Sequence, residues 1–156
     1  MFNVPRASAA CAAIASPVPE NQLCEVVVSF ILPSVVLFVD DVQRLTRFYQ
    51  ALARITLVYD APDHALLEID GFQLVIHALP PGATTDGAAA QPVQVREDSY
   101  MKLCLPVRSI ADARSIAAAH GGSIAPVARE WAARGFRACD GHDPEGNVVQ
   151  VREAAA

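Results

Sequence analysis

The same order of predicted elements occurs twice between residues 32 and 153. In each copy an apolar strand precedes an amphipathic helix, and three short strands follow. The first copy places these elements near 34–39, 42–52, 55–59, 65–69 and 72–79. The second copy places them near 100–107, 110–120, 123–127, 135–139 and 147–152. A repeat this regular predicts an α+β fold of two tandem βαβββ modules, 32–79 and 99–153, related by a pseudo-twofold axis.

Capping and turn signals support this division. Asp41 and Ser109 are placed to cap the first turns of the two helices. The pair Asp70-Gly71 is typical of a tight hairpin turn, and Gly121 suits the left-handed residue that ends a helix. We therefore expect a single domain at 31–156, whose modules are joined by a Pro-, Gly-, Ala- and Thr-rich linker at 80–98 that is a mobile crossover.

Residues 1–30 have a different composition, rich in Ala, Ser and Pro in their first part, and we expect a poorly ordered extension. Their apolar stretch 9–15 only faintly resembles a secretory signal, so we predict a cytoplasmic protein. The apolar run 26–39 is too short and interrupted to span a bilayer. A net charge of −5 argues against a nucleic-acid-binding surface. Membranes and nucleic acids are therefore excluded as expected partners.

The four cysteines, Cys11, Cys24, Cys104 and Cys139, include no CxxC pair. We expect them to be reduced, and their spacing does not predict a structural zinc site.

Three features in order resemble the vicinal oxygen chelate superfamily, which includes glyoxalases, bleomycin-resistance proteins and extradiol dioxygenases. They are a strand leading through Asp40-Asp41 to a helix with Phe48-Tyr49, the pair Gly121-Gly122, and Asp143-Pro-Glu-Gly-Asn147 before the last strand. The resemblance implies a curved, cup-shaped mixed sheet with helices on its outer face. The family usually ends its first helix with Leu-Gly, whereas Ala53-Arg54 stands here. A left-handed arginine costs roughly 1–2 kcal/mol, so we expect this helix to end differently.

Metal-dependent members of this superfamily place ligands on the first and last strands of each module. The resemblance assigns these places to Ser34, Val75, Lys102 and Gln150. A catalytic divalent ion needs about three protein ligands, and of these four only Gln150 could serve. We therefore predict no metal, no other cofactor and no catalytic residue at this position.

Strand alternation predicts which side chains line the cup. The inward faces carry Ser34, Val36 and Phe38, then Gln73, Val75 and His77, then Lys102 and Cys104, then Val148, Gln150 and Arg152. Trp131, in a loop before the strand at 135–139, could close on a ligand or pack. His64 and His120 are expected to be structural or solvated, and His142 is expected to stay on the surface. Phe48 and Tyr49 are expected to lie in the core, Asp143 to hold its turn, and Cys104 to be inert. The predicted ligand-binding residues are Ser34, Phe38, Gln73, His77, Lys102, Trp131, Gln150 and Arg152.

Lys102, Arg152 and His77 give this lining a basic character, so we expect a neutral or anionic, partly apolar small molecule. The favoured function is metal-independent binding or sequestration of that molecule by a homodimer, rather than catalysis. One alternative is a metal-dependent lyase, isomerase or dioxygenase of the same fold, with a displaced metal set that could include His77 and His142. Another is an accessory subunit with a vestigial pocket.

Overall fold

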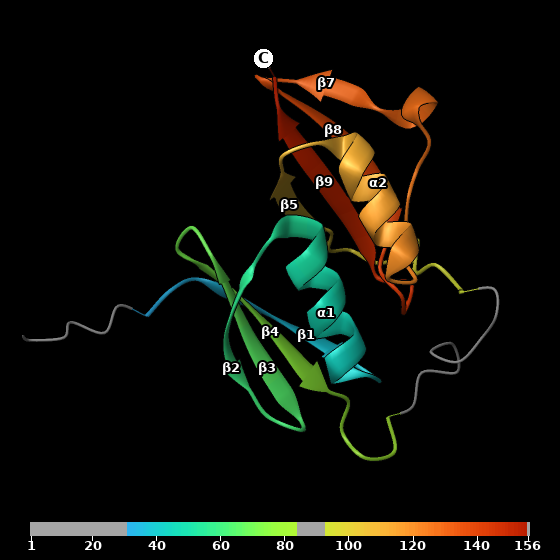
Figure 1. The fold of residues 1–156 in the computed structure, drawn as a ribbon. Helices are drawn as coiled ribbons and strands as arrows, with labels where there is room; N and C mark the ends of the chain where they lie inside the picture. The colour runs from blue at the N-terminus through green and yellow to red at the C-terminus, as the bar shows by residue number, and fades with distance from the viewer. Residues whose placement is uncertain (1–30, 84–92, 156) are drawn as a thin grey trace, which may run out of the picture. The chain divides into compact units, whose positions relative to one another are not determined.

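The computed structural model describes residues 31–83 and 93–155 (Figure 1). The predicted extension at 1–30 and the middle of the predicted linker, residues 84–92, lie outside the described residues, as do Cys11 and Cys24. Within the described ranges, no helix combines the length and the apolar character needed to cross a membrane.

The first module is a four-stranded mixed sheet with one helix. Its strands run in the order β1-β4-β3-β2, with β1 parallel to β4 and the other pairs antiparallel. Its elements are β1 (Ser34–Val39), α1 (Val42–Ala53), β2 (Thr56–Asp60), β3 (His64–Ile69) and β4 (Phe72–Ala78).

The second module repeats this plan and adds a strand. The order is β5-β9-β8-β6, again with the first and last strands parallel, and β7 pairs with β8. Its elements are β5 (Leu103–Val107), α2 (Ile110–Ala119), β6 (Ser123–Ile124), the 3-10 helix η1 (Val127–Arg129), β7 (Trp131–Ala133), β8 (Phe136–His142) and β9 (Val148–Ala154). The two modules confirm the predicted α+β fold class, although hydrogen bonding divides the strands into two sheets.

Three predictions for the second module are wrong in detail. The strand predicted at 100–107 starts only at Leu103, which pairs with Val149, one residue after the start of β9. The strand predicted at 123–127 ends at Ile124, since Val127 opens the 3-10 turn in which the Arg129 N–H donates to the Pro126 carbonyl. Trp131 lies on β7 rather than in a loop.

The predicted caps are confirmed. The Asp41 carboxylate accepts a hydrogen bond from the Arg44 N–H at 2.9 Å, and the Ser109 hydroxyl accepts one from the Asp112 N–H at 3.1 Å. Gly121 has a φ of 85° and Gly71 one of 77°, as their turns require. The expectation for Arg54 is wrong, since it ends α1 with φ 56° and ψ 37°. Both its neighbours, Ala53 and Ile55, are buried, so core packing holds the chain in this strained conformation.

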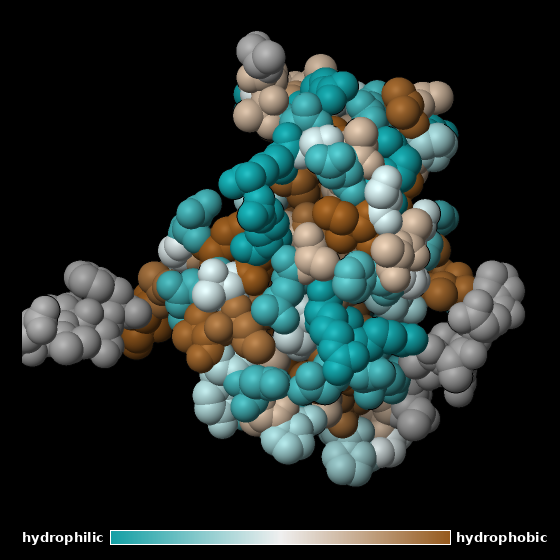
Figure 2. All heavy atoms as spheres, viewed as in Figure 1, coloured by the Kyte–Doolittle hydropathy of each residue, from teal (hydrophilic) through white to brown (hydrophobic). Residues whose placement is uncertain are grey.

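Both helices pack against their sheets and contribute to one hydrophobic core that includes residues of both modules. Phe48 and Tyr49 on α1 are fully buried, as predicted. Gly122 lies so close to α1 that a Cβ would stand 2.5 Å from Cε2 of Phe48, which leaves no room for a side chain. The outer surface of α1 is hydrophilic (Figure 2), as expected of an amphipathic helix.

The turn between β8 and β9 joins the modules through buried carboxylates. Asp143 is fully buried and accepts hydrogen bonds from the Tyr49 hydroxyl at 2.8 Å and from the backbone N–H groups of Glu145 and Asn147. Glu145 in turn accepts from the backbone N–H groups of Asp40 and Asp41, both at 2.9 Å. Asp143 therefore holds its turn, as predicted, and the turn fixes the start of α1.

Candidate functional site

The predicted alternation is confirmed on β1 and β4. Val36 and Phe38 are 49% and 47% exposed, while Val39 of the opposite phase is fully buried. The parallel register places Ser34 beside Gln73, Val36 beside Val75 and Phe38 beside His77. These six residues therefore form one side of the first sheet, on the face away from the core.

Four rings cross this face of the first sheet, one from each strand. Centroid distances are 5.4 Å from Phe38 to His77, 5.8 Å from His77 to His64, and 5.1 Å from His64 to Tyr59. His64 and Tyr59 were missed as lining residues. Extending the alternation to the strand at 64–69 would have found His64, because antiparallel pairing sets it opposite His77.

The second sheet carries a chain of polar contacts on the equivalent face. Lys102 Nζ lies 3.0 Å from Asp140 Oδ2, and the Gln150 amide donates to Asp140 Oδ1 at 2.9 Å. Partial burial acts to raise the pKa of Asp140, but these contacts from Gln150 and Lys102 outweigh it and the pKa is lowered. Asp140 was not predicted; the antiparallel register of β8 and β9 pairs it with Gln150.

Arg152 continues this chain toward the aromatic end of the sheet. Its Nε donates to Gln150 Oε1 at 2.7 Å, and its Nη2 lies 3.1 Å from Cys104 Sγ. Its guanidinium carbon lies 5.0 Å from the centroid of the Phe136 ring, which contacts Trp131 at 6.0 Å. Arg152 forms no ion pair with any carboxylate in the described part of the chain.

An open pocket of about 500 Å³ lies at the other end of this face. Lys102, Arg129, Asp140 and His142 line it, with Ser123 and residues 95, 97 and 99 of the predicted linker. His142, expected at the surface, is half-buried here, and its Nδ1 donates to the Asp143 carbonyl at 2.9 Å. His120 is exposed at the end of α2, as predicted.

The structure thus divides the predicted ligand-binding residues into two groups. Ser34, Phe38, Gln73 and His77 lie together on the first sheet, and Lys102, Trp131, Gln150 and Arg152 lie together on the second. Among residues 31–83 and 93–155, no hydrogen bond, ion pair or ring contact joins the two groups. A larger open groove, about 720 Å³, lies between the end of α1 and the start of α2, away from both groups.

The four positions that the resemblance assigns to metal ligands do not fit a divalent ion. Val75 has no donor atom, Lys102 is a cation paired with Asp140, and Ser34 is a neutral hydroxyl. Gln150 is 94% buried, and its amide is already bonded to Asp140 and Arg152. In the described ranges, no three His, Cys, Asp or Glu side chains are grouped closely enough to hold a metal.

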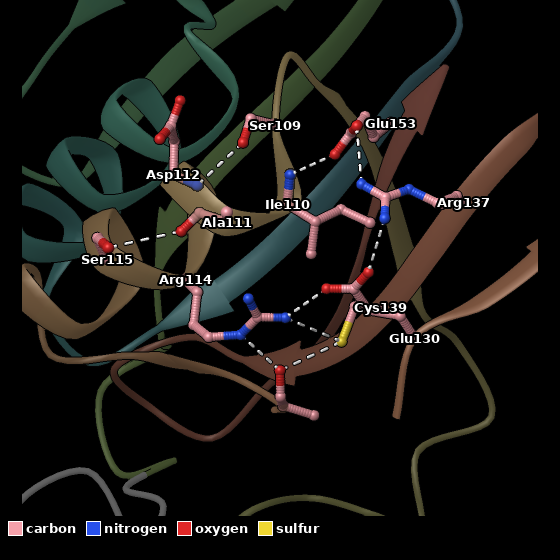
Figure 3. Close-up of polar contacts among 11 residues, drawn as sticks. Ser109, Ile110, Ala111, Asp112, Arg114, Ser115, Glu130, Arg137, Cys139 and Glu153 are labelled. Atoms are coloured by element: carbon pink, nitrogen blue, oxygen red, sulfur yellow. Dashed lines mark hydrogen bonds and ion pairs between the residues drawn. The ribbon is translucent and has the colours of Figure 1, made fainter. Parts of the chain in front are cut away.

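The other charged network of the second module is structural (Figure 3). Glu130 pairs with Arg114 of α2 at 2.8 Å and with Arg137 at 3.2 Å, and Arg137 pairs with Glu153 at 2.9 Å. Glu153 also accepts a hydrogen bond from the Ile110 N–H at 2.7 Å, and these contacts lower the pKa of its carboxyl. The two carboxylates and two guanidiniums neutralise one another. Ile110 and Arg114 belong to α2, whereas Arg137 lies on β8 and Glu153 on β9, so this network attaches α2 to its sheet.

Comparison with known proteins identifies the family. A family model described as a glyoxalase-like domain matches residues 34–152. A glyoxalase/bleomycin resistance protein/dioxygenase family enzyme from Burkholderia phytofirmans PsJN is 16% identical, with a TM-score of 0.57 over 78% of this chain and 96% of that one. No curated protein matches the sequence.

Two fosfomycin resistance proteins have similar folds. FosX from Mesorhizobium loti is 14% identical, with a TM-score of 0.54 over 82% of this chain and 94% of that one. FosX from Listeria monocytogenes, solved with Mn(II) and a sulfate ion, is 14% identical, with a TM-score of 0.55 over 82% of this chain and 92% of that one. At these identities the structures establish the fold alone, whereas the family model covers most of the chain. The chain therefore belongs to the glyoxalase-like domain family of the vicinal oxygen chelate superfamily.

Proposed function

We propose that this protein binds or sequesters a small anionic or neutral, partly apolar molecule on the face of its second sheet, without a metal ion. The observation that carries the proposal is the guanidinium of Arg152. It is half-buried, held by Gln150 and Cys104, and has no carboxylate partner among the described residues. A guanidinium in this situation is suited to a carboxylate or phosphate-like group, which it can bind through two parallel hydrogen bonds.

The surroundings of Arg152 support a ligand with an apolar part. Phe136 lies under the guanidinium, and Trp131, 43% exposed, stands edge-on to Phe136. Aromatic rings beside a fixed cation can cover the apolar part of an organic acid while the cation binds its charged end. A purely inorganic anion would contact the guanidinium but leave the two aromatic rings uncovered.

The charge of this face supports the same ligand class. Lys102, Arg129 and Arg152 are its cations, against the carboxylates of Asp140 and Glu97, although the whole chain carries a net charge of −5. A local excess of positive charge on an acidic protein attracts anions and disfavours cationic drugs of the bleomycin type. The similar FosX structure that holds Mn(II) and sulfate provides an anion-binding precedent in this fold. Its metal is not carried over, because the equivalent positions here lack suitable donors.

Calorimetry with a panel of carboxylates and phosphonates, with and without added Mn²⁺, tests the proposal. Arg152→Gln removes the charge, and a hydrogen bond to a charged group contributes about 2 kcal/mol, so affinity for the best acid should fall about 30-fold. Arg47→Gln is the matched control, because Arg47 is an exposed arginine of α1. Tighter binding of a cationic glycopeptide, equal losses in both variants, or binding only with Mn²⁺ would refute the proposal.

The same experiment separates the alternatives. A metal-dependent lyase, isomerase or dioxygenase would need a displaced set of ligands, but no three His, Cys, Asp or Glu side chains of the described residues are grouped closely enough to hold a metal. A subunit with a vestigial pocket would gain no thermal stability from any acid, whereas a ligand-binding protein gains stability with ligand concentration.

A cytoplasmic homodimer belongs to the same proposal. Val36, Phe38 and Tyr59 expose about half of their surface on the first sheet, and exposed apolar side chains on a sheet face are candidates for contact with a second copy of the chain. Sedimentation equilibrium of the full chain would test the dimer, and a monomer at all concentrations would remove this part of the proposal.

A further inference from the structure

We propose that the open pocket of about 500 Å³ at the end of the second sheet receives a neutral, hydroxyl-bearing part of the ligand, so that the ligand is a hydroxylated organic acid. This inference rests on the proposed function, because the acid group of the ligand stays on Arg152 and the same molecule extends along the sheet into the pocket.

The pocket and Arg152 lie on one face of the second sheet. Val148, which lines the pocket, has the same phase on β9 as Arg152 and is four residues away, so their Cα atoms are about 13 Å apart. Between them, Gln150 accepts a hydrogen bond from Arg152 at 2.7 Å and donates one to Asp140 at 2.9 Å. Asp140 in turn pairs with Lys102, and both residues line the pocket. One ligand can therefore contact both ends of this face.

The charged side chains that line the pocket balance one another. Lys102 and Arg129 are the cations, and Asp140 and Glu97 are the carboxylates. Both oxygens of Asp140 are already bonded, Oδ2 to the Lys102 ammonium and Oδ1 to the Gln150 amide. A second carboxylate of the ligand would lie near these carboxylates, and an ammonium would lie near the two cations. Either ion would lose hydration without a net electrostatic gain, so the second end of the ligand is neutral.

The available hydrogen-bonding atoms call for a group that both donates and accepts. His142 Nδ1 donates to the Asp143 carbonyl, so the neutral imidazole has its lone pair on Nε2, which has no partner within residues 31–83 and 93–155. The Lys102 ammonium has further N–H donors besides the one directed at Asp140. A hydroxyl can donate to Nε2 and accept from Lys102. A carboxylate has no proton for Nε2, and an ammonium accepts nothing from Lys102.

These atoms are held in position by neighbouring side chains and strands. The His142 ring is fixed by the backbone of Asp143, which is fully buried, and the Lys102 ammonium is fixed by Asp140. Ser123 on β6 is the cross-strand partner of His142, and in the described ranges its hydroxyl has no hydrogen-bond partner. Several separate polar groups on fixed elements suit several hydroxyls on one carbon chain.

Calorimetry of the full chain with three six-carbon acids tests the proposal. Hexanoate has an apolar chain, adipate has a second carboxylate, and gluconate has hydroxyls along its chain. We expect gluconate to bind more tightly than adipate, and gluconate but not hexanoate should shift the His142 ring signals in NMR. Ser123→Ala and His142→Phe each remove one hydrogen-bonding group, so each should lower the ratio of gluconate affinity to hexanoate affinity about 5-fold. Ser115→Ala and His120→Phe, at exposed positions on α2 and at its end, are the matched controls and should leave this ratio unchanged.

Tighter binding of adipate than of gluconate, a ratio that Ser123→Ala and His142→Phe leave unchanged, or His142 signals that gluconate does not shift would overturn the proposal. Arg152→Gln separates this failure from failure of the acid site. If Arg152→Gln weakens both hexanoate and gluconate about 30-fold while the pocket variants leave the ratio unchanged, the acid site stands and the hydroxyl subsite is refuted. If no acid binds, or if Arg152→Gln has no effect, the acid site is refuted, and the subsite with it.

Discussion

Removing the Tyr49 hydroxyl tests whether the buried carboxylate of Asp143 holds the two modules together. In Tyr49→Phe the ring keeps its packing in the core, and only the hydrogen bond to Asp143 Oδ2, 2.8 Å long, is lost. Asp143 keeps three donors, namely the backbone N–H groups of Glu145 and Asn147 and the Asn147 side-chain amide. The carboxylate is therefore not left unpaired, and the variant should fold.

The expected loss follows from the charge of the acceptor. A hydrogen bond to a charged group stabilises a folded protein by about 1.5–3 kcal/mol, so Tyr49→Phe should lower the free energy of unfolding at pH 7 by about 2 kcal/mol. With a urea dependence of about 1–3 kcal/mol per molar, the midpoint of unfolding should fall by roughly 1 M. Tyr100→Phe, at a fully exposed tyrosine, is the control and should change the free energy of unfolding by less than about 0.5 kcal/mol.

The pH dependence gives the prediction a second, independent measurement. Burial of the hydroxyl, reinforced by the Asp143 charge, raises the pKa of Tyr49 well above its ordinary value. Above about pH 10 the unfolded chain loses this proton first, so the free energy of unfolding falls as pH rises toward the folded-state pKa. Phenylalanine cannot ionise, and the difference between wild type and Tyr49→Phe should shrink above pH 10. A difference that matches Tyr100→Phe at pH 7, or that is constant up to pH 11, would refute the reasoning.

Two further variants test the helix ends. Arg54→Gly should raise the free energy of unfolding by about 0.5–1 kcal/mol, because relief of a left-handed side chain outweighs the backbone entropy of glycine; a lower urea midpoint would contradict it. Glu153→Gln should lower the free energy of unfolding at pH 7 by about 0.5 kcal/mol, because the charge at the start of α2 is lost. The Ile110 N–H and Arg137 lower the pKa of Glu153, so its contribution is present above the unfolded pKa and is lost as pH falls; an equal effect in urea titrations at pH 3 and pH 7 would argue against this reading.

The fold could be predicted because its signals are local and occur twice. Asp41 and Ser109 cap helices by accepting hydrogen bonds from backbone N–H groups three residues later in the chain. In a strand, every second side chain points to the same face, so the face can be assigned from the sequence alone. The strand at 123–127 ended early because of a local 3-10 turn, but in two other places a contact between distant residues decided the outcome. The strand at 100–107 is short because β9 begins at Val148, and Arg54 is left-handed because its neighbours enter the core.

For the candidate site, the sequence predicted which face of a strand a side chain lies on, but not which residues of the neighbouring strand it contacts. Alternation correctly placed Gln150 and Arg152 on one side of β9, but it says nothing about the partner strand. Asp140, which binds both Lys102 and Gln150, therefore went unnoticed, as did Phe136 under Arg152. His64 was expected to be structural or solvated because the predicted strand began one residue later, at residue 65, whereas β3 begins at His64 and the antiparallel register sets it against His77.

The two modules share one backbone arrangement but carry chemically different side chains at equivalent positions. His77 and Arg152 lie two residues beyond Val75 and Gln150, the equivalent positions of the last strands of the two modules. The cross-strand neighbour then decides what each can do. His77 faces another imidazole, His64, so the two rings stack with their centroids 5.8 Å apart. Arg152 faces Ala138, whose small side chain leaves space for the guanidinium to lie over Phe136. Because the difference is carried by the neighbouring strand, exchanging only the residues at 77 and 152 would transfer neither property.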